Sequence, residues 1–298
     1  MQNMKLAFKF LITFGIIHGI TGQANANNVY TAYSGSQQGV TIRDANTLMQ
    51  SGIIGTNFNV NGIAAGHSNN VYLTSGNQIF NYSTNGSLLN SFTWYDNTII
   101  YGDTSVGSNN IYTAYSGSQQ GVTIRDAETL AQSAIIGTGF NINGVSAGHN
   151  DNVYLTSGNS IFNYSTNGSL LNSFTWYDNS ITYGDIAVSA NNVFTVYAGS
   201  QQGVTIRDLD TLTQTGLIIP GFDIDGIAVG FNDDVYLTSG NQIFNYSTNG
   251  SLLNSFTWYD NTIAYGDISV APVPVPAAAW LFGSGLIGLI GLRRKISR

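Results

Sequence analysis

The sequence predicts an all-β fold, a six-bladed β-propeller, and three observations lead to this prediction. The chain contains three copies of an 82-residue repeat, which begin at Asn27, Asn109 and Asn191. Each repeat divides into two similar halves, so that Asn28-Val29-Tyr30 in the first half corresponds to Asn70-Val71-Tyr72 in the second. Each half has the pattern of four short strands. Four strands in about 40 residues is the spacing of propeller blades.

The strands of one half are separated by turn sequences. Val71–Thr74 and Gln78–Tyr82 flank a Ser-Gly-Asn sequence, which predicts a β-hairpin. Asn85-Gly86 favours a type I′ turn that leads into a third strand, Ser87–Trp94. A further strand precedes each group, represented by Gly62–Gly66 and Asp103–Val106. No part of the repeats has sustained helical periodicity.

The ends of the repeat region predict that the array closes into a ring. The repeats span residues 27–108, 109–190 and 191–270. The first begins with the second strand of a blade, at Val29, and the last ends with a lone first strand, Asp267–Val270. Pairing of these pieces completes a blade and protects the sheet edges. The alternative is a parallel β-solenoid, which would require shorter and more uniform coils.

The half-repeats resemble the blades of YVTN, NHL and PQQ-like propellers. The resemblance rests on the strand spacing and on the turn sequences given above. The combined Gly-His and Trp-Asp signature of WD40 repeats is absent, because no tryptophan is followed by aspartate. The resemblance implies the propeller fold, which by itself does not specify an activity.

The first 26 residues have the features of a secretory signal peptide. Lys5 and Lys9 supply a positive region, and Leu11–Ile20 is mostly apolar. Ala24 and Ala26 satisfy the small-x-small rule for cleavage, which predicts a mature protein beginning at Asn27. Signal peptidase is then a partner during export. The alternative is an uncleaved membrane anchor.

The sequence of residues 271–298 predicts a second targeting segment, at the C-terminus. Three alternating prolines keep Ala271–Pro276 extended. Residues 277–292 are uncharged and apolar, and as a helix they would span about 24 Å, which is short for a bilayer crossing. The basic residues that follow favour a cytoplasmic C-terminus and therefore repeats outside the membrane.

The order of these parts resembles the PEP-CTERM sorting signal of Gram-negative bacteria. Residues 273–295, VPVPAAAWLFGSGLIGLIGLRRK, are most similar to the VPLPA variant. The residues that carry the motif are Val273, Pro274, Val275, Pro276, Ala277, Arg293, Arg294 and Lys295.

The resemblance implies recognition by an exosortase, cleavage near the Pro motif after transient membrane anchoring, and a link to exopolysaccharide or biofilm matrix. Val275 stands where the commonest form has Glu, so the subclass of processing enzyme stays open. The alternative interpretation of the tail is an ordinary C-terminal anchor.

Charge excludes one class of partner. Between the two terminal segments there are three arginines and sixteen acidic residues, which give this region a net charge of −13. Such a body repels phosphate backbones, so nucleic acid is not an expected partner. The chain has no cysteine, and the sequence indicates no cofactor and no metal site.

The loop between Trp94 and Asp103 is the best candidate binding surface, because aromatic rings beside carboxylates suit sugars. Its copies are Trp176–Asp185 and Trp258–Asp267. Three convergent aspartates could alternatively hold a divalent cation. Equally, the aromatic rings could pack between blades and the aspartates could bind turn amides. The candidate residues are Trp94, Tyr95, Asp103, Trp176, Tyr177, Asp185, Trp258, Tyr259 and Asp267.

Catalysis is not expected from this sequence. His67 and His149 are accompanied by no nucleophile pattern, and the third repeat has Phe231 in their place. Arg43 and its copies are expected to pair with an acid of a neighbouring blade, and Asp44 to set a turn. The sequence therefore predicts a non-enzymatic structural or binding protein at the cell surface or outside the cell. The alternatives are a lactonase- or lyase-like enzyme and a protein-binding propeller.

Overall fold

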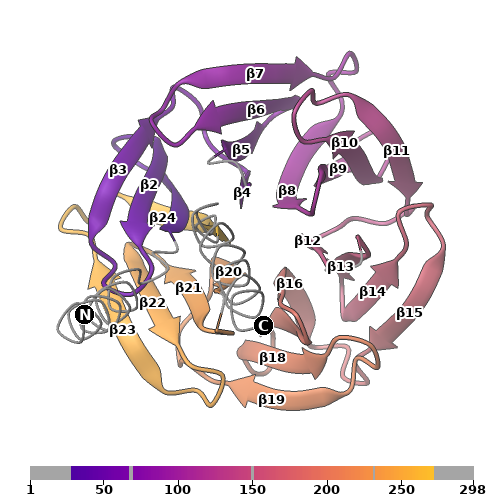
Figure 1. Cartoon of the computed structure of the whole chain (residues 1–298). Helices are drawn as coiled ribbons and strands as arrows, with labels where there is room; N and C mark the ends of the chain where they lie inside the picture. The colour runs from indigo at the N-terminus through magenta and orange to yellow at the C-terminus, as the bar shows by residue number, and fades with distance from the viewer. Residues whose placement is uncertain (1–27, 67–69, 149–150, 231, 272–298) are drawn as a thin grey trace, which may run out of the picture. The chain divides into compact units, whose positions relative to one another are not determined.

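The computed structural model describes residues 28–66, 70–148, 151–230 and 232–271. These residues form 24 strands in six four-stranded antiparallel sheets, which are arranged as blades around a central axis (Figure 1). The predicted six-bladed β-propeller is therefore confirmed, and the solenoid alternative is excluded.

The strands of each blade run from the axis outward in the following order. Blade 1 contains β24 (Ala264–Ala271), β1 (Asn28–Ser34), β2 (Gly39–Asp44) and β3 (Gln50–Gly55). Blade 2 contains β4 (Gly62–Ala65), β5 (Asn70–Ser75), β6 (Gln78–Ser83) and β7 (Leu88–Thr93). Blade 3 contains β8 (Ile100–Val106), β9 (Asn110–Ser116), β10 (Gly121–Asp126) and β11 (Gln132–Gly137).

The second half of the ring repeats this order. Blade 4 contains β12 (Gly144–Ala147), β13 (Val153–Ser157), β14 (Ser160–Tyr164) and β15 (Leu170–Thr175). Blade 5 contains β16 (Thr182–Val188), β17 (Asn192–Ala198), β18 (Gly203–Asp208) and β19 (Gln214–Ile218). Blade 6 contains β20 (Gly226–Val229), β21 (Val235–Ser239), β22 (Gln242–Tyr246) and β23 (Leu252–Thr257). Predicted and observed strands differ at their ends by three residues or fewer for the representative strands given above.

Blade 1 closes the ring by combining the two ends of the repeat region. The last strand, β24, pairs antiparallel with β1, with Asn28 opposite Ala271 and Ser34 opposite Ala264. The predicted closing strand thus exists and is longer than the expected Asp267–Val270. Closure gives β1 a partner on each side, so blade 1 has the same four strands as the other blades.

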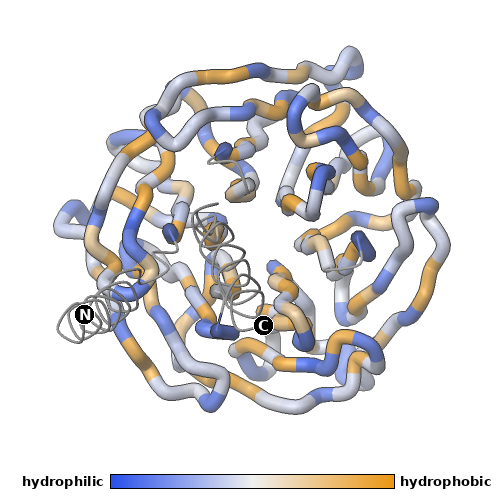
Figure 2. Tube along the Cα trace, in the orientation of Figure 1, coloured by the Kyte–Doolittle hydropathy of each residue, from blue (hydrophilic) through white to orange (hydrophobic). Residues whose placement is uncertain are grey.

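Burial follows the position of a strand within its blade. β1 and β2 are almost continuously buried, because both faces of their sheet pack against neighbouring blades. The outermost strand β7 alternates between exposed and partly exposed residues. Figure 2 shows this alternation as mixed hydrophilic and hydrophobic colouring along the strands. The core therefore lies between the blades rather than at the axis.

The six junctions between blades have two alternating compositions. At the junctions of blades 1 and 2, 3 and 4, and 5 and 6, two phenylalanine rings stack, as Phe58 does on Phe80 at 4.4 Å between centroids. At the other three junctions a tryptophan packs among tyrosines and an arginine, as Trp94 does beside Tyr115. The 82-residue period produces this alternation, since each repeat supplies two different half-units.

The predicted signal peptide 1–26 and the tail beyond residue 271 lie outside the described residues. Within the part of the chain that the structure describes, no helix is long and apolar enough to cross a membrane. The predicted hydrophobic segment 277–292 and the sorting motif therefore stay predictions.

A hairpin glycine allows a close backbone approach at each tryptophan-containing junction. Gly117, between β9 and β10, has a φ of 128°, and a Cβ at this position would lie 1.9 Å from the carbonyl oxygen of Thr98. Thr98 belongs to the connection that leaves blade 2. Only glycine therefore allows the hairpin of blade 3 to approach the preceding connection this closely.

We predict that Gly117→Ala lowers the free energy of unfolding by on the order of 3 kcal/mol, because the junction must open to admit the methyl group. Gly137→Ala is the matched control, since a Cβ at that position would have no atom within 4 Å. Urea denaturation of both variants measures the difference. Equal stabilities would show that the approach of Gly117 to Thr98 does not constrain the junction.

Candidate functional site

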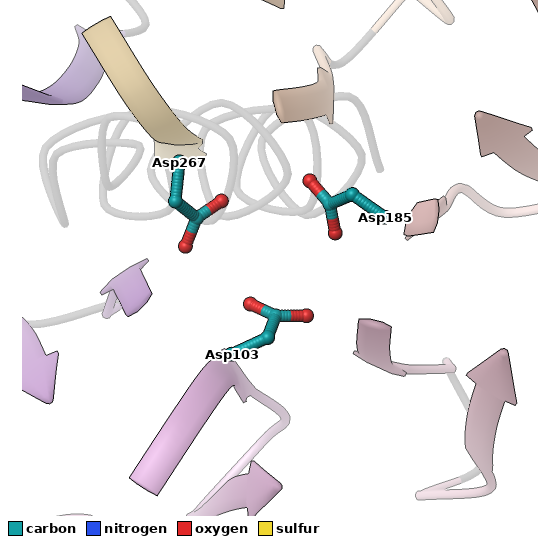
Figure 3. A group of neighbouring side chains, drawn as sticks. All are labelled: Asp103, Asp185 and Asp267. Carbon is teal, nitrogen blue, oxygen red and sulfur yellow. The ribbon is translucent and has the colours of Figure 1, made fainter. Parts of the chain in front are cut away.

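Three aspartates converge at the axis of the propeller. Asp103, Asp185 and Asp267 lie on the innermost strands β8, β16 and β24, and their side chains point toward one another (Figure 3). One carboxylate oxygen from each lies within 4.8 Å of the others. The convergence that the repeat spacing predicts is therefore present.

Each carboxylate accepts two backbone hydrogen bonds. Its Oδ1 accepts from the N–H of the next residue in its own strand, as Asp103 does from Thr104 at 2.6 Å. Its Oδ2 accepts from the innermost strand of the following blade, as Asp103 does from Val145 at 2.6 Å. The equivalent bonds to the following blade are Ile227 N–H to Asp185 at 2.8 Å and Ile63 N–H to Asp267 at 2.6 Å. Three side chains therefore satisfy six strand-edge N–H groups.

Glycine occupies the corresponding position in the alternate blades. A Cβ on Gly62 would lie 2.5 Å from the carbonyl oxygen of Gly102 and 2.9 Å from the Cα of Asp103. Gly144 and Gly226 make similarly close approaches to blades 5 and 1. The blades therefore alternate around the axis: in one blade a carboxylate accepts a hydrogen bond from the following blade, and in the next blade a glycine packs closely against the blade after it.

A second layer of hydrogen bonds follows further along the strands. The N–H groups of Ala147 and Ala65 donate to the hydroxyl oxygens of Ser105 and Ser269, each at 3.0 Å. The second repeat has Ala187 at this position and offers no hydroxyl. The serine hydrogen bonds therefore occur in two of the three repeats, whereas the aspartate hydrogen bonds occur in all three.

Burial raises the pKa values of the three carboxyl groups, and repulsion adds to the rise at Asp103 and Asp267. Burial is the largest cause for Asp103, followed by the charges of Asp185 and Asp267, and its pKa lies well above the usual value. Burial likewise raises the pKa of Asp185 to about 6 and that of Asp267 well above the usual range. The triad therefore favours retention of a proton near neutral pH.

The space beside the triad is small. The axial cavity has a volume of about 140 Å³ and is lined by the six innermost strands. Pockets that hold small organic ligands usually measure about 300–1,000 Å³. Carboxylates are ligands that Ca²⁺ and Mg²⁺ accept, but these ions take six or more ligands, and each carboxylate here already accepts two N–H groups. The geometry therefore favours a structural role for the triad.

The tryptophans lie at the rim of the molecule, each in a stack of three aromatic rings. Trp94 follows the outermost strand β7 and stacks on Tyr115 at 6.1 Å between centroids. Tyr95 stacks on Trp94 at 6.0 Å and is 92% exposed. Tyr101 and Phe92 pack edge-on against the tryptophan. The same stacking of tryptophan on both tyrosines occurs at Trp176 and Trp258.

A buried arginine lies beneath each stack. The guanidinium of Arg125 lies 3.5 Å from the centroid of the Phe92 ring, and the residue is 2% exposed. It donates to Leu130 O at 2.9 Å, to Tyr101 Oη at 3.3 Å and to Gln132 Oε1 at 3.1 Å. These partners are neutral, so the expected pairing of Arg43 and its copies with an acid is wrong. The aromatic face and neutral oxygens stabilise the charge instead.

The aspartate that follows each arginine forms a turn, as the sequence predicts. Asp126 accepts hydrogen bonds from the backbone and hydroxyl of Thr129 at 2.8 and 2.7 Å. The turn places Leu130 at a φ of 59°, an uncommon conformation for a branched residue. The bond from Arg125 to Leu130 O helps to hold this conformation.

Open grooves lie beside two of these stacks, where blade 4 meets blade 5 and where blade 6 meets blade 1. The groove of blade 5 has a volume of about 470 Å³ and includes Phe174, Trp176, Tyr177, Arg207, Thr213 and Gln214. The groove of blade 1 has a volume of about 330 Å³ and includes Phe256, Trp258, Tyr259, Arg43, Met49 and Gln50. Both volumes fall within the range of small-ligand sites. We call these surfaces the rim grooves.

The structure divides the predicted candidate surface into two places. Trp176, Tyr177, Trp258 and Tyr259 line the rim grooves, and Trp94 and Tyr95 form the same stack at the junction of blades 2 and 3. Asp103, Asp185 and Asp267 line the axial cavity. Sequence reasoning missed the arginine, threonine and glutamine of the grooves, because they belong to the next blade and no local pattern connects them to the tryptophan. His67 and His149 lie outside the described residues.

Comparison with known proteins supports the fold and nothing finer. No family model matches the chain, and no curated protein matches it. A protein of unknown function from Bacteroides caccae is similar, with a TM-score of 0.65 and 12% identity over 82% of this chain and 98% of its own.

Two further solved structures give the same result. A chain of the nidogen/laminin complex has a TM-score of 0.67 and 13% identity over 82% of this chain and 98% of its own. The WD40 propeller domain of Doa1 has a TM-score of 0.59 and 10% identity over 85% of this chain and 88% of its own. At these identities the similarity establishes the class, a β-propeller, and no particular function.

We predict that the axial triad makes the fold more stable as the pH falls from about 6.5 to 4.5. A carboxyl group whose pKa rises on folding binds its proton more tightly in the folded state than in the unfolded state, where its pKa is about 3.8. As the pH rises above that value, the free energy of unfolding falls by up to about 1.4 kcal/mol per pH unit for each proton that only the folded state holds. Urea denaturation at both pH values should show this slope, and Asp185→Asn should flatten it.

Asp178→Asn is the control for this experiment. Asp178 is exposed, and hydrogen bonds from Ser180 lower its pKa, so its own stability contribution changes only below about pH 4. The slope of this variant should match that of the wild type. An unchanged slope in Asp185→Asn would contradict the proton-binding role of the triad.

We predict that Arg125→Met lowers the free energy of unfolding by about 2–4 kcal/mol, because it leaves the buried acceptors Leu130 O and Tyr101 Oη without their donor. Gln132→Ala, which removes only the exposed acceptor, should cost less than about 1 kcal/mol. Thermal and urea denaturation measure both. Similar losses in the two variants would contradict a supporting role for the buried guanidinium.

Proposed function

We propose that this protein is an exported, non-enzymatic propeller that serves as a structural or binding component of the extracellular polysaccharide matrix. The observation that carries the proposal is the set of exposed aromatic stacks on the rim. Each presents a tyrosine that is at least 91% exposed on top of a partly buried tryptophan. Exposed aromatic rings beside a packed tryptophan suit the apolar faces of sugar rings.

The axis supports a non-enzymatic role. Enzymes place reactive groups where a substrate can approach them, but the axial aspartates share a cavity of only about 140 Å³. Their oxygens already accept strand-edge N–H groups. The lactonase- or lyase-like alternative therefore has less support than a binding role at the rim.

The terminal sequences support export. The features of residues 1–26 favour signal peptidase cleavage after Ala26. The tail resembles a sorting signal whose known processing enzymes are exosortases, which would anchor the protein transiently in the membrane and then transfer it to the cell surface or the medium. The exopolysaccharide link rests on this resemblance together with the aromatic rim.

We predict that the mature protein from its native host begins at Asn27 and ends near Pro276, and that it is recovered at the cell surface or in the medium together with extracellular polysaccharide. Intact-mass measurement of each cell fraction tests both processing events. A protein that retains residues 277–298 in the inner membrane, and is absent from the polysaccharide fraction, would contradict the proposal.

A further inference from the structure

We infer that the rim stacks form three separate binding sites for neutral saccharides, which makes one propeller trivalent. The inference rests on the proposed function and identifies where and how the polysaccharide is bound. The described residues show the same arrangement at all three tryptophan-containing junctions: stacked Tyr and Trp rings, an edge-on Phe and a guanidinium beneath them.

The tryptophan of each stack is packed in place before any ligand arrives. Tyr177 stacks on Trp176 with planes 23° apart, and Trp176 stacks on Tyr197 with planes 14° apart. The tyrosine is 92% exposed, whereas Tyr197 is 3% exposed. The tryptophan is therefore backed by a buried ring, and the tyrosine keeps nearly its whole surface available to a ligand. A tryptophan that is already held in place loses little entropy when a ligand binds.

Polar groups border the aromatic floor and can orient hydroxyl groups. Gln132 is exposed, and its Oε1 accepts a hydrogen bond from Arg125 at 3.1 Å. This bond turns the amide oxygen toward the arginine and leaves the amide N–H groups as donors to a ligand. The bond from Arg43 to Gln50 at 3.4 Å gives the same arrangement in the groove of blade 1.

Charge selects a neutral ligand. A guanidinium beneath each groove disfavours cations at the aromatic face. Asp178 directly follows Tyr177, and hydrogen bonds from Ser180 lower its pKa, which keeps it ionised. With a net charge of −13 on residues between the terminal segments, the surface also repels polyanions. A neutral molecule with flat apolar faces and hydroxyl edges, which is the chemistry of a hexose ring, meets both conditions.

The three sites are not identical. Among the positions that line the grooves of blades 1 and 5, only one differs between them: Met49 in the first and Thr213 in the second. Ala131 occupies it in blade 3. Met49 is 70% exposed, and its groove measures about 330 Å³ against about 470 Å³ beside Thr213. We therefore expect the Met49 site to bind more weakly.

Three sites on one rim allow cross-linking. The stacks follow the 82-residue period around a closed ring, so they face different directions and cannot all contact one short oligosaccharide. A long polysaccharide, or several chains, can engage more than one of them. Binding to a polymer then gains from effective concentration, even where each site alone is weak.

Calorimetric titration of the purified full chain tests the inference, with neutral hexasaccharides of glucose, mannose, galactose and N-acetylglucosamine as probes. At least one probe should bind with a stoichiometry of three, and the Met49 site should be about three- to tenfold weaker than the others. Met49→Thr should merge the two affinity classes. Each of Tyr95→Ala, Tyr177→Ala and Tyr259→Ala should weaken one site about tenfold, the loss expected for one aromatic contact.

The triple Tyr→Phe variant is the matched control, because it keeps the ring and should keep binding. The exposed tyrosines contribute little to folding, and circular dichroism checks that the variants fold. No binding to any of the four neutral probes, or binding that survives the triple Tyr→Ala substitution, would overturn the inference. So would stronger binding of an oligogalacturonate, or of a synthetic Ala-Pro-Val-Pro-Val-Pro peptide that corresponds to residues 271–276.

These outcomes are separable from failure of the proposed function. A triple Tyr→Ala protein that still co-fractionates with extracellular polysaccharide in the native host would overturn the rim sites and leave the matrix role intact. Saccharide binding by a protein that is retained in the inner membrane would leave the rim sites intact and overturn the matrix role.

Discussion

The innermost strand of every blade has one edge that faces the axis and pairs with no other strand. Unpaired backbone N–H groups in such a half-buried position are costly, and three aspartates satisfy six of them. Each carboxylate bonds within its own strand and to the next blade. The triad thus joins the blades in pairs around the axis, and the glycine between neighbouring carboxylates provides the space in which this packing is possible.

This arrangement has an electrostatic cost, and it gives the axis a structural role that differs from the role of the rim. Burial raises the pKa values of the three neighbouring carboxyl groups, and the charge of Asp185 adds to the rise at Asp103 and Asp267. Side chains of the innermost strands therefore fill much of the space at the axis and leave only a small cavity. The rim offers more room for a ligand, and each repeat exposes one tyrosine there beside a packed tryptophan.

Near-identity of the repeats has a further consequence. The arginine, the aromatic stack and the turn with its left-handed leucine recur in each copy because the sequence recurs, so their repetition does not provide three independent arguments for function. The differences are more informative. Met49, Ala131 and Thr213 change one wall of otherwise matching surfaces, and Ala187 removes one hydroxyl from the serine layer at the axis.

The sequence by itself determined the number of blades, the strands within them and the closure by the last strand, because these depend on local turn chemistry and on the repeat period. It also placed three aspartates at the axis. It did not assign the aspartates and the tryptophans to different sites, because a single ten-residue segment contains one of each. That loop runs from the outermost strand of one blade to the innermost strand of the next, so its two ends belong to different sites. Only the tertiary structure decided that Arg125 pairs with an aromatic ring and neutral oxygens rather than with an acid. Phe92 comes from the neighbouring blade, Tyr101 from the innermost strand of the same blade, and Leu130 from a turn whose geometry no local pattern specifies.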